Sequence, residues 1–154
     1  MIATPENTLI IIPVYNSYTH LIKLHQEIYK AMPNCNLICV DDGSTDLSLE
    51  IIKILRINYI SLESNMGKGF ALKTGMSYAQ ENNYQYVITL DSDLQHDPAF
   101  LRNFFLVCNK EKADIVIGFR SFSFKNMPFP RVFSNYLTSL ILSQKTGKFI
   151  LLFS

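Results

Sequence analysis

The feature that most constrains this chain is a series of short apolar runs separated by segments with helical periodicity. The runs lie at residues 9–14, 37–40, 59–62, 86–90 and 115–117. Most are uninterrupted rather than alternating, which is typical of strands buried on both faces of a sheet. Strands that alternate with helices form a mostly parallel sheet covered on both sides. We therefore predict a single α/β domain built as a three-layer α/β/α sandwich.

The segments between the runs carry apolar side chains at helical spacing. Their predicted buried faces are Leu21, Leu24 and Ile28; Leu49, Ile52 and the stem of Arg56; Ala71, Leu72, Gly75, Met76 and Ala79; and Leu101, Phe104, Phe105 and Cys108. Pro98 stands where the last of these helices would begin, and a further helix is expected over residues 131–143. In parallel sheets ligands bind at the carboxyl ends of the strands, so the polar residues that follow the runs are the candidates for a site.

The composition excludes several classes of protein. Hydrophobic residues make up 48% and charged residues 18% of the chain, as in a globular domain and unlike a disordered one. The formal net charge is +1 with no run of Lys or Arg, so nucleic acid is not an expected partner. No apolar stretch is long enough for a signal-peptide core or a membrane-spanning helix. We expect a cytoplasmic chain, with a peripheral position on the cytoplasmic face of the inner membrane left open.

Two carboxylates follow the fourth run, in an Asp-Ser-Asp-Leu-Gln sequence that begins at Asp91. If the chain turns there, Asp91 and Asp93 can face one ligand and form a hard oxygen site for Mg²⁺ or Mn²⁺, to which Gln95 could add a neutral oxygen. A metal at this place would bridge phosphate oxygens and neutralise charge on a departing diphosphate. The alternative is turn and helix-cap chemistry, which we favour for Asp97 alone.

Adjacent carboxylates also end the second run, at Asp41 and Asp42. Gly43 allows a tight turn after them, and Ser44 or Thr45 can cap the helix that follows. A turn does not account for two neighbouring carboxylates at the edge of a sheet. One of the two could accept hydrogen bonds from a nucleobase or a ribose.

Other side chains near the expected sheet edge have two interpretations each. Tyr15, after the first run, could border a base or be a partly buried core residue. Lys68 lies between two glycines at a helix start, where the backbone can approach an anion, or it is a solvated lysine. Its surroundings match neither a dinucleotide fingerprint nor a Walker loop. Arg120 and Arg131 could each hold a phosphate or be surface residues.

Together these pieces resemble the family 2 glycosyltransferases with a GT-A fold. The matching stretches are Ile12-Pro13-Val14-Tyr15-Asn16, Val40-Asp41-Asp42-Gly43-Ser44-Thr45-Asp46, Asn65-Met66-Gly67-Lys68-Gly69-Phe70-Ala71-Leu72 and Asp91-Ser92-Asp93-Leu94-Gln95-His96-Asp97-Pro98. Each is modest alone, but their order and spacing are specific, and they cover about residues 8–140. The last stretch, with Arg120 and Arg131 after it, is most similar to the branch that glycosylates polyprenyl phosphates, such as the dolichyl-phosphate mannose synthases.

The resemblance implies a reaction and a set of roles. A hexose would move with inversion from a nucleotide-diphospho-sugar, GDP- or UDP-linked, to a polyprenyl phosphate. The donor would be held by Pro13, Tyr15, one or both of Asp41 and Asp42, Lys68 and Ser92, and the metal by Asp91, Asp93 and Gln95. Asp91 and Asp93 would serve catalysis together with Arg120 and Arg131, and the two arginines would face the acceptor phosphate.

Residues 144–154 depart from the family pattern, because they do not match its acceptor-side segment. We therefore expect a sandwich that is incomplete at its C-terminus. One rival hypothesis is an inactive, donor-binding remnant of the same family. A more distant one is a sugar-1-phosphate nucleotidylyltransferase, which shares the layered fold. It would carry a Gly-rich loop with Arg near the first strand, where Pro13-Val14-Tyr15-Asn16 stands instead.

Overall fold

A computed structural model describes residues 2–94, 98–112 and 115–116 of the chain. The strands are β1 (Thr8–Val14), β2 (Asn36–Asp41), β3 (Asn58–Ser61) and β4 (Tyr86–Thr89). The helices are α1 (Tyr18–Ala31), α2 (Ser48–Ile54), α3 (Lys68–Glu81) and α4 (Leu101–Glu111), and the short 3-10 helix η1 (Pro98–Phe100) precedes α4. Each of the first four apolar runs is thus a strand, with ends within one residue of those predicted.

The described strands form one parallel sheet in the order β3-β2-β1-β4. The strand β1 lies between β2 and β4, and Ile11 is in register with Ile38 on one side and with Thr89 on the other. Every residue of β1 is buried. Burial on both faces is therefore confirmed for β1 and, but for Asn36, for β2. It is wrong for β3 and β4, which lie at the edges of the described sheet and leave side chains exposed.

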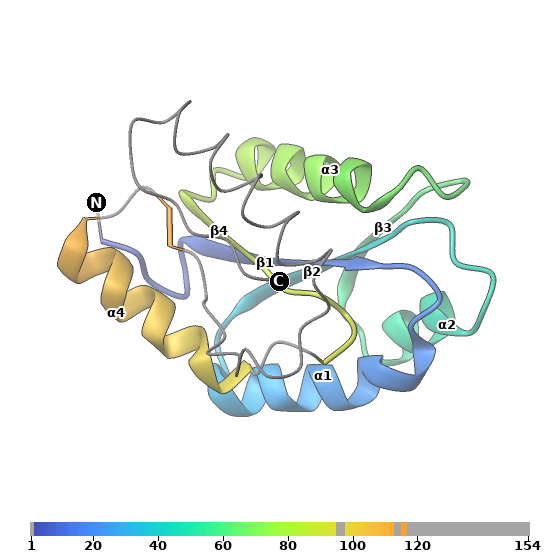
Figure 1. Ribbon diagram of the computed structural model, residues 1–154, viewed down its shortest axis with the longest axis horizontal. Coiled ribbons are helices and arrows are strands. Elements are labelled where there is room, and N and C mark those ends of the chain that lie inside the picture. The colour runs from blue at the N-terminus through green and yellow to red at the C-terminus, as the bar shows by residue number, and fades with distance from the viewer. Residues whose placement is uncertain (1, 95–97, 113–114, 117–154) are drawn as a thin grey trace, which may run out of the picture. The chain divides into compact units, whose positions relative to one another are not determined.

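Helices cover both faces of the sheet (Figure 1). Alternate side chains of β1 point to opposite faces because the side-chain period of a strand is two. Ile10, Ile12 and Val14 belong to one core cluster, and Leu9 and Ile11 belong to another. The first cluster is completed by apolar side chains of α1, α2 and α4, and the second by those of α3. The three-layer sandwich predicted from the sequence is therefore confirmed.

The predicted helical faces are buried or half-buried, apart from two residues. Leu21, Leu24 and Ile28 face the core as a group. The prediction is wrong for Arg56, because α2 ends at Ile54 and Arg56 lies exposed beyond it with a φ of 55°. It is also wrong for Met76, whose side chain is 49% exposed.

Of the elements predicted after residue 112, the structure describes only a small part. Residues 115 and 116, the described part of the fifth apolar run, are not in a strand. The helix expected over residues 131–143 and the atypical segment 144–154 lie outside the described residues. None of the helices that the structure describes is long and apolar enough to cross a membrane.

The helix α3 approaches β1 closely at Gly75. A Cβ atom at this position would lie 2.5 Å from Cγ2 of Ile11, a side chain that is fully buried. Because Gly75 has no side chain, α3 packs directly on the central strand. The helix α3 begins at Lys68, beside the carboxyl end of the sheet.

We predict that Gly75→Ala lowers the free energy of unfolding by about 1–3 kcal/mol, the usual cost of forcing an extra carbon into a packed core. Urea denaturation followed by circular dichroism measures this change. Ser77→Ala is the matched control, because Ser77 is an exposed residue of the same helix and its replacement should change stability by less than about 0.5 kcal/mol. Equal stability of the two variants would contradict the close packing of α3 on β1.

Candidate functional site

The loops that follow β1, β2 and β4 meet at one edge of the sheet, because parallel strands have their carboxyl ends on the same side. Two backbone hydrogen bonds continue the sheet beyond the strands into these loops. The Asp42 N–H donates to the Val14 carbonyl at 2.8 Å, and the Leu90 N–H donates to the Ile11 carbonyl at 3.0 Å. The residues that follow Val14, Asp42 and Leu90 are therefore neighbours in space.

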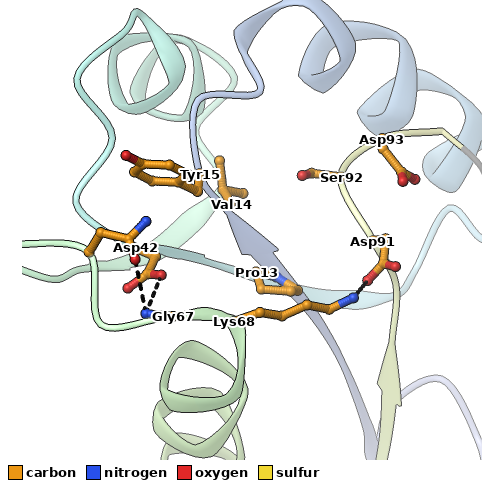
Figure 2. A pocket seen from close by; sticks show the side chains of 10 residues that line it. Pro13, Val14, Tyr15, Asp42, Gly67, Lys68, Asp91, Ser92 and Asp93 are labelled. Carbon is orange, nitrogen blue, oxygen red and sulfur yellow. Dashed lines mark hydrogen bonds and ion pairs between the residues drawn. The ribbon is translucent and has the colours of Figure 1, made fainter. Parts of the chain in front are cut away.

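A cavity of about 380 Å³ opens at this edge (Figure 2). It is lined by Pro13, Val14, Tyr15, Asp42, Asn65, Gly67, Lys68, Asp91, Ser92 and Asp93. All the described residues that the sequence places in the site are in this lining except Asp41. Gln95, Arg120 and Arg131 lie outside the described residues.

The two adjacent carboxylates of the second loop have different positions. Asp42 is 3% exposed, and its carboxylate accepts hydrogen bonds from the N–H groups of Met66 at 2.8 Å and Gly67 at 2.9 Å. It thus fixes the loop that leads into α3. Asp41 is 1% exposed and accepts from the Ser61 hydroxyl at 3.1 Å and from the Ser44 N–H at 3.3 Å. Of the two carboxylates, Asp42 borders the cavity and Asp41 holds the turn.

The turn after Asp42 depends on Gly43. This residue has a φ of 69°, and a Cβ atom there would lie 2.5 Å from the backbone carbon of Ser64. Both the left-handed conformation and the close approach favour glycine. The loop after β2 therefore packs directly against the loop that precedes α3.

The cap of α2 differs from the prediction. Neither Ser44 nor Thr45 caps this helix, because Asp46 accepts the Ser48 N–H at 2.9 Å. Asp46 also accepts the Tyr18 N–H at 3.3 Å, so it serves the starts of α1 and α2 together. Burial alone would raise the pKa of Asp46, but the hydrogen bonds from Ser48 and Tyr18 outweigh this and lower the pKa.

The Ser44 and Thr45 groups instead bind the loop after β1. The Asn16 N–H donates to the Ser44 hydroxyl at 3.0 Å, and the Thr45 N–H donates to the Asn16 side-chain oxygen at 2.8 Å. The Ser17 N–H donates to the fully buried Ser48 hydroxyl at 2.8 Å. Together these bonds hold the first two loops in a fixed relation.

Lys68 is paired with a carboxylate across the cavity. Its Nζ lies 2.6 Å from Oδ1 of Asp91, and Figure 2 shows the lysine side chain reaching from the start of α3 toward the end of β4. The lysine is therefore not simply solvated, which was the alternative left open by the sequence. Its side chain is 59% exposed and that of Asp91 is 31% exposed, so the pair is accessible to a ligand.

The chain turns directly after Asp91. Residues 92 and 93 form a turn, and Leu94 has a φ of 58°, an uncommon conformation for leucine. This geometry meets the condition under which Asp91 and Asp93 can border one cavity, and both do. Tyr15, which was left open between core and site, is 47% exposed and borders the same cavity.

The carboxylate oxygens that line the cavity suit a divalent cation whose other ligands are phosphate oxygens and water. In the described part of the chain no group of three or more His, Cys, Asp or Glu side chains could hold a metal ion. Magnesium and manganese commonly bind through one or two carboxylates, with substrate phosphates and water completing the shell. Asp91 and Asp93 offer these carboxylates, and Asp91 already holds a cationic group, the ammonium of Lys68.

Sequence reasoning missed three lining residues, Val14, Asn65 and Gly67. All three lie within the stretches that carry the family resemblance. Gly67 is one of the two glycines that flank Lys68, but the sequence assigned no role in the site to its own atoms. Asn65 accepts the Gly67 N–H through its side-chain oxygen at 3.1 Å, which only the folded loop reveals. Their place in the site follows from backbone position, so a search for reactive side chains could not find them.

Comparison with known proteins gives a consistent result. The chain matches the family described as Glycosyl transferase family 2 over residues 9–153. It is 29% identical to the polyprenol monophosphomannose synthase of Mycolicibacterium smegmatis, over 75% of this chain and 45% of that protein. It is 25% identical to the dodecaprenyl-phosphate galacturonate synthase of Rhizobium johnstonii, over 90% of this chain and 43% of that protein.

Solved structures agree on the fold. TarS of S. aureus in complex with UDP superposes with a TM-score of 0.63 at 22% identity, covering 81% of this chain and 39% of that one. The glucosyl-3-phosphoglycerate synthase of Mycobacterium tuberculosis, in complex with Mn²⁺, UDP and glucosyl-3-phosphoglycerate, superposes with a TM-score of 0.55 at 21% identity. It covers 66% of this chain and 39% of that one. The fold is therefore of the GT-A type.

The chain spans between 27% and 60% of the length of the curated relatives it matches. The family match extends over nearly all of the chain itself, and it decides against the nucleotidylyltransferase alternative. On its sequence, and in agreement with its fold, the chain belongs to glycosyl transferase family 2.

Proposed function

We propose that this chain binds a nucleotide-diphospho-sugar together with Mg²⁺ or Mn²⁺ and transfers the hexose, with inversion, to a polyprenyl phosphate. The observation that carries the proposal is a single cavity in which Asp91, Asp93 and Lys68 meet at the carboxyl edge of a parallel sheet. This places anionic and cationic groups together, as a ligand that consists of a diphosphate and its counter-ion requires.

The two ends of the cavity suit the two parts of the donor. Tyr15 and Asp42 lie at one end, with an aromatic ring and carboxylate oxygens suited to a nucleoside (Figure 2). Each oxygen of Asp42 accepts one backbone N–H and keeps a lone pair for a base or ribose donor. Lys68, Asp91 and Asp93 lie at the other end, where the diphosphate would sit. The structural relatives solved with UDP support a nucleoside diphosphate as the ligand.

Asp91 and Asp93 would hold the cation, and Gln95 would add an oxygen. When bound, the metal would neutralise charge on the diphosphate leaving group. For the cation to reach Asp91, the ammonium of Lys68 would withdraw from Oδ1 and remain within reach of the diphosphate. The relative solved with both Mn²⁺ and UDP supports a divalent cation in this fold.

The acceptor is proposed from the relatives rather than from the cavity. Two of them are named as synthases of a polyprenol monophosphomannose and a dodecaprenyl-phosphate galacturonate. A lipid phosphate is already an anion, so its attack on the sugar needs little help from a general base. Arg120 and Arg131 would bind this phosphate and draw the chain to the membrane surface.

The first test of the proposed function concerns Asp93. Isothermal titration of the wild-type chain with UDP or GDP should show binding that depends on Mn²⁺, and Asp93→Ala should abolish that dependence because a metal ligand is lost. Glu81→Ala is the control, since Glu81 is an exposed carboxylate at the end of α3 and removes the same charge. If Asp93→Ala binds nucleotide with unchanged metal dependence, the metal assignment is wrong.

The second prediction concerns Lys68, whose replacement should act in opposite directions on the two ligands. Lys68→Met should raise the affinity for Mn²⁺ alone about two- to fivefold, because a partly exposed ion pair contributes at most about 1 kcal/mol. It should lower the affinity for the nucleoside diphosphate, because a cation is lost. Lys73→Met, which removes the same charge from an exposed position of α3, should change neither affinity more than twofold.

The result that argues against this arrangement is a Lys68→Met variant that behaves like Lys73→Met toward both Mn²⁺ and the nucleoside diphosphate. Mn²⁺ binding is measured by electron paramagnetic resonance of the free ion, which requires no activity.

The third prediction concerns transfer itself. Vesicles that contain a polyprenyl phosphate, incubated with the chain, Mn²⁺ and a labelled GDP- or UDP-hexose, should yield a labelled lipid, and Asp91→Asn should yield none. Nucleotide binding without any transfer by the wild-type chain would instead support an inactive, donor-binding remnant. The assay therefore separates the two functions that the family membership leaves open.

A further inference from the structure

The hydroxyl of Ser17 has hydrogen-bond partners that are unusual for a serine at the start of a helix. Ser17 is the N-cap residue of α1, a position where a serine side chain normally accepts a backbone N–H of the first turn. Here it makes no such bond. The N–H of Tyr18, the first residue of this helix, donates to Asp46. The Ser17 hydroxyl bonds partners outside the helix.

Those partners are the Tyr15 carbonyl, at 3.1 Å, and the hydroxyl of Ser92, at 2.9 Å. Ser92 is the middle residue of the turn that carries Asp91 and Asp93, and it comes 75 residues later in the chain. The contact therefore joins the loop after β1 to the loop after β4. Ser17 is itself anchored, because its N–H donates to the buried hydroxyl of Ser48 at 2.8 Å.

The direction of these hydrogen bonds follows from the number of protons. A serine hydroxyl has one proton, and a carbonyl oxygen can only accept. Ser17 therefore donates to the Tyr15 carbonyl, and Ser92 must donate to Ser17. The Ser92 oxygen, which lines the cavity, is then left with lone pairs alone. It can accept from a ligand hydroxyl or approach a cation, but it has no proton to offer to a phosphate oxygen.

We propose that Ser17 is a positioning residue, which acts through Ser92 to hold the Asp91–Asp93 turn in the orientation that binds the metal and the nucleotide. Ser17 itself is not part of the cavity lining. The inference rests on the proposed function, because it concerns how tightly the same site takes its ligands. In Figure 2 the Ser92 side chain points away from the Asp93 carboxylate, as an anchor of the turn would.

The test is a double-mutant cycle on Ser17 and Ser92, measured as the affinity for UDP or GDP in the presence of Mn²⁺. Ser17→Ala and Ser92→Ala should each weaken binding about three- to tenfold, the usual effect of losing one hydrogen bond. The affinity of the double variant should equal that of whichever single variant binds the nucleotide more weakly, because both changes break the same Ser17–Ser92 hydrogen bond. Ser17→Thr keeps the hydroxyl and should restore binding to within about twofold of wild type.

Ser44→Ala is the matched control, because the Ser44 hydroxyl also bonds the loop after β1, where it accepts the Asn16 N–H, whereas the Ser92 hydroxyl is bonded to Ser17. It should leave the affinity within about twofold of wild type. Three outcomes would each overturn the role of Ser17. The losses of nucleotide affinity could multiply in the double variant, Ser17→Ala could bind nucleotide as wild type does, or Ser44→Ala could lose as much affinity as Ser17→Ala.

Hydrogen exchange of the ligand-free chain separates this inference from the proposed function. Ser17→Ala should increase amide exchange in the peptide that covers residues 90–94, and Ser44→Ala should not. Unchanged exchange in Ser17→Ala would overturn the positioning role even if nucleotide binds well. Failure of the wild-type chain to bind any nucleotide with Mn²⁺ would overturn the proposed function, while the exchange result would still decide whether Ser17 holds the turn.

Discussion

The parallel pairing of β1 with β2 on one side and with β4 on the other is the constraint on which the site depends. It places the ends of three strands together, so that Tyr15, Asp42 and Asp91 meet although they are far apart in the sequence. The fully buried β1 can occupy the centre because both of its faces are apolar. The close packing of α3 on Ile11, which the absence of a side chain at Gly75 permits, then adds Lys68 to the same edge.

Hydrogen bonds between the loops that follow the strands fix the walls of the cavity. Asp42 holds the loop that starts α3, Asp46 holds the starts of α1 and α2, and Ser17 links to Ser92. These hydrogen bonds fix the loops relative to one another within the protein. The groups at the far end of the cavity, Lys68 and Asp91, are instead paired across it in an accessible position.

Much of the fold could be predicted from the sequence, because uninterrupted apolar runs and helical spacing report burial directly. The strand ends and the faces of α1 and α4 follow from these patterns. The exposure of β3 and β4 could not be predicted, because hydropathy does not tell which strand lies at a sheet edge. The motif residues identify the cavity, yet they do not separate Asp41 from Asp42. That distinction depends on which side chain bonds the loop before α3.

We propose that one cavity takes a divalent cation and a nucleoside diphosphate together. The most direct measurement is the paramagnetic broadening of backbone amide signals when Mn²⁺ is added to the isotope-labelled chain with UDP or GDP. The account predicts that the signals of Ser92, Asp93 and Lys68 broaden first, and more strongly with the nucleotide than without it. Signals on the exposed face of α3 around Lys73 should broaden later. Broadening that begins elsewhere, or that the nucleotide does not change, would contradict it.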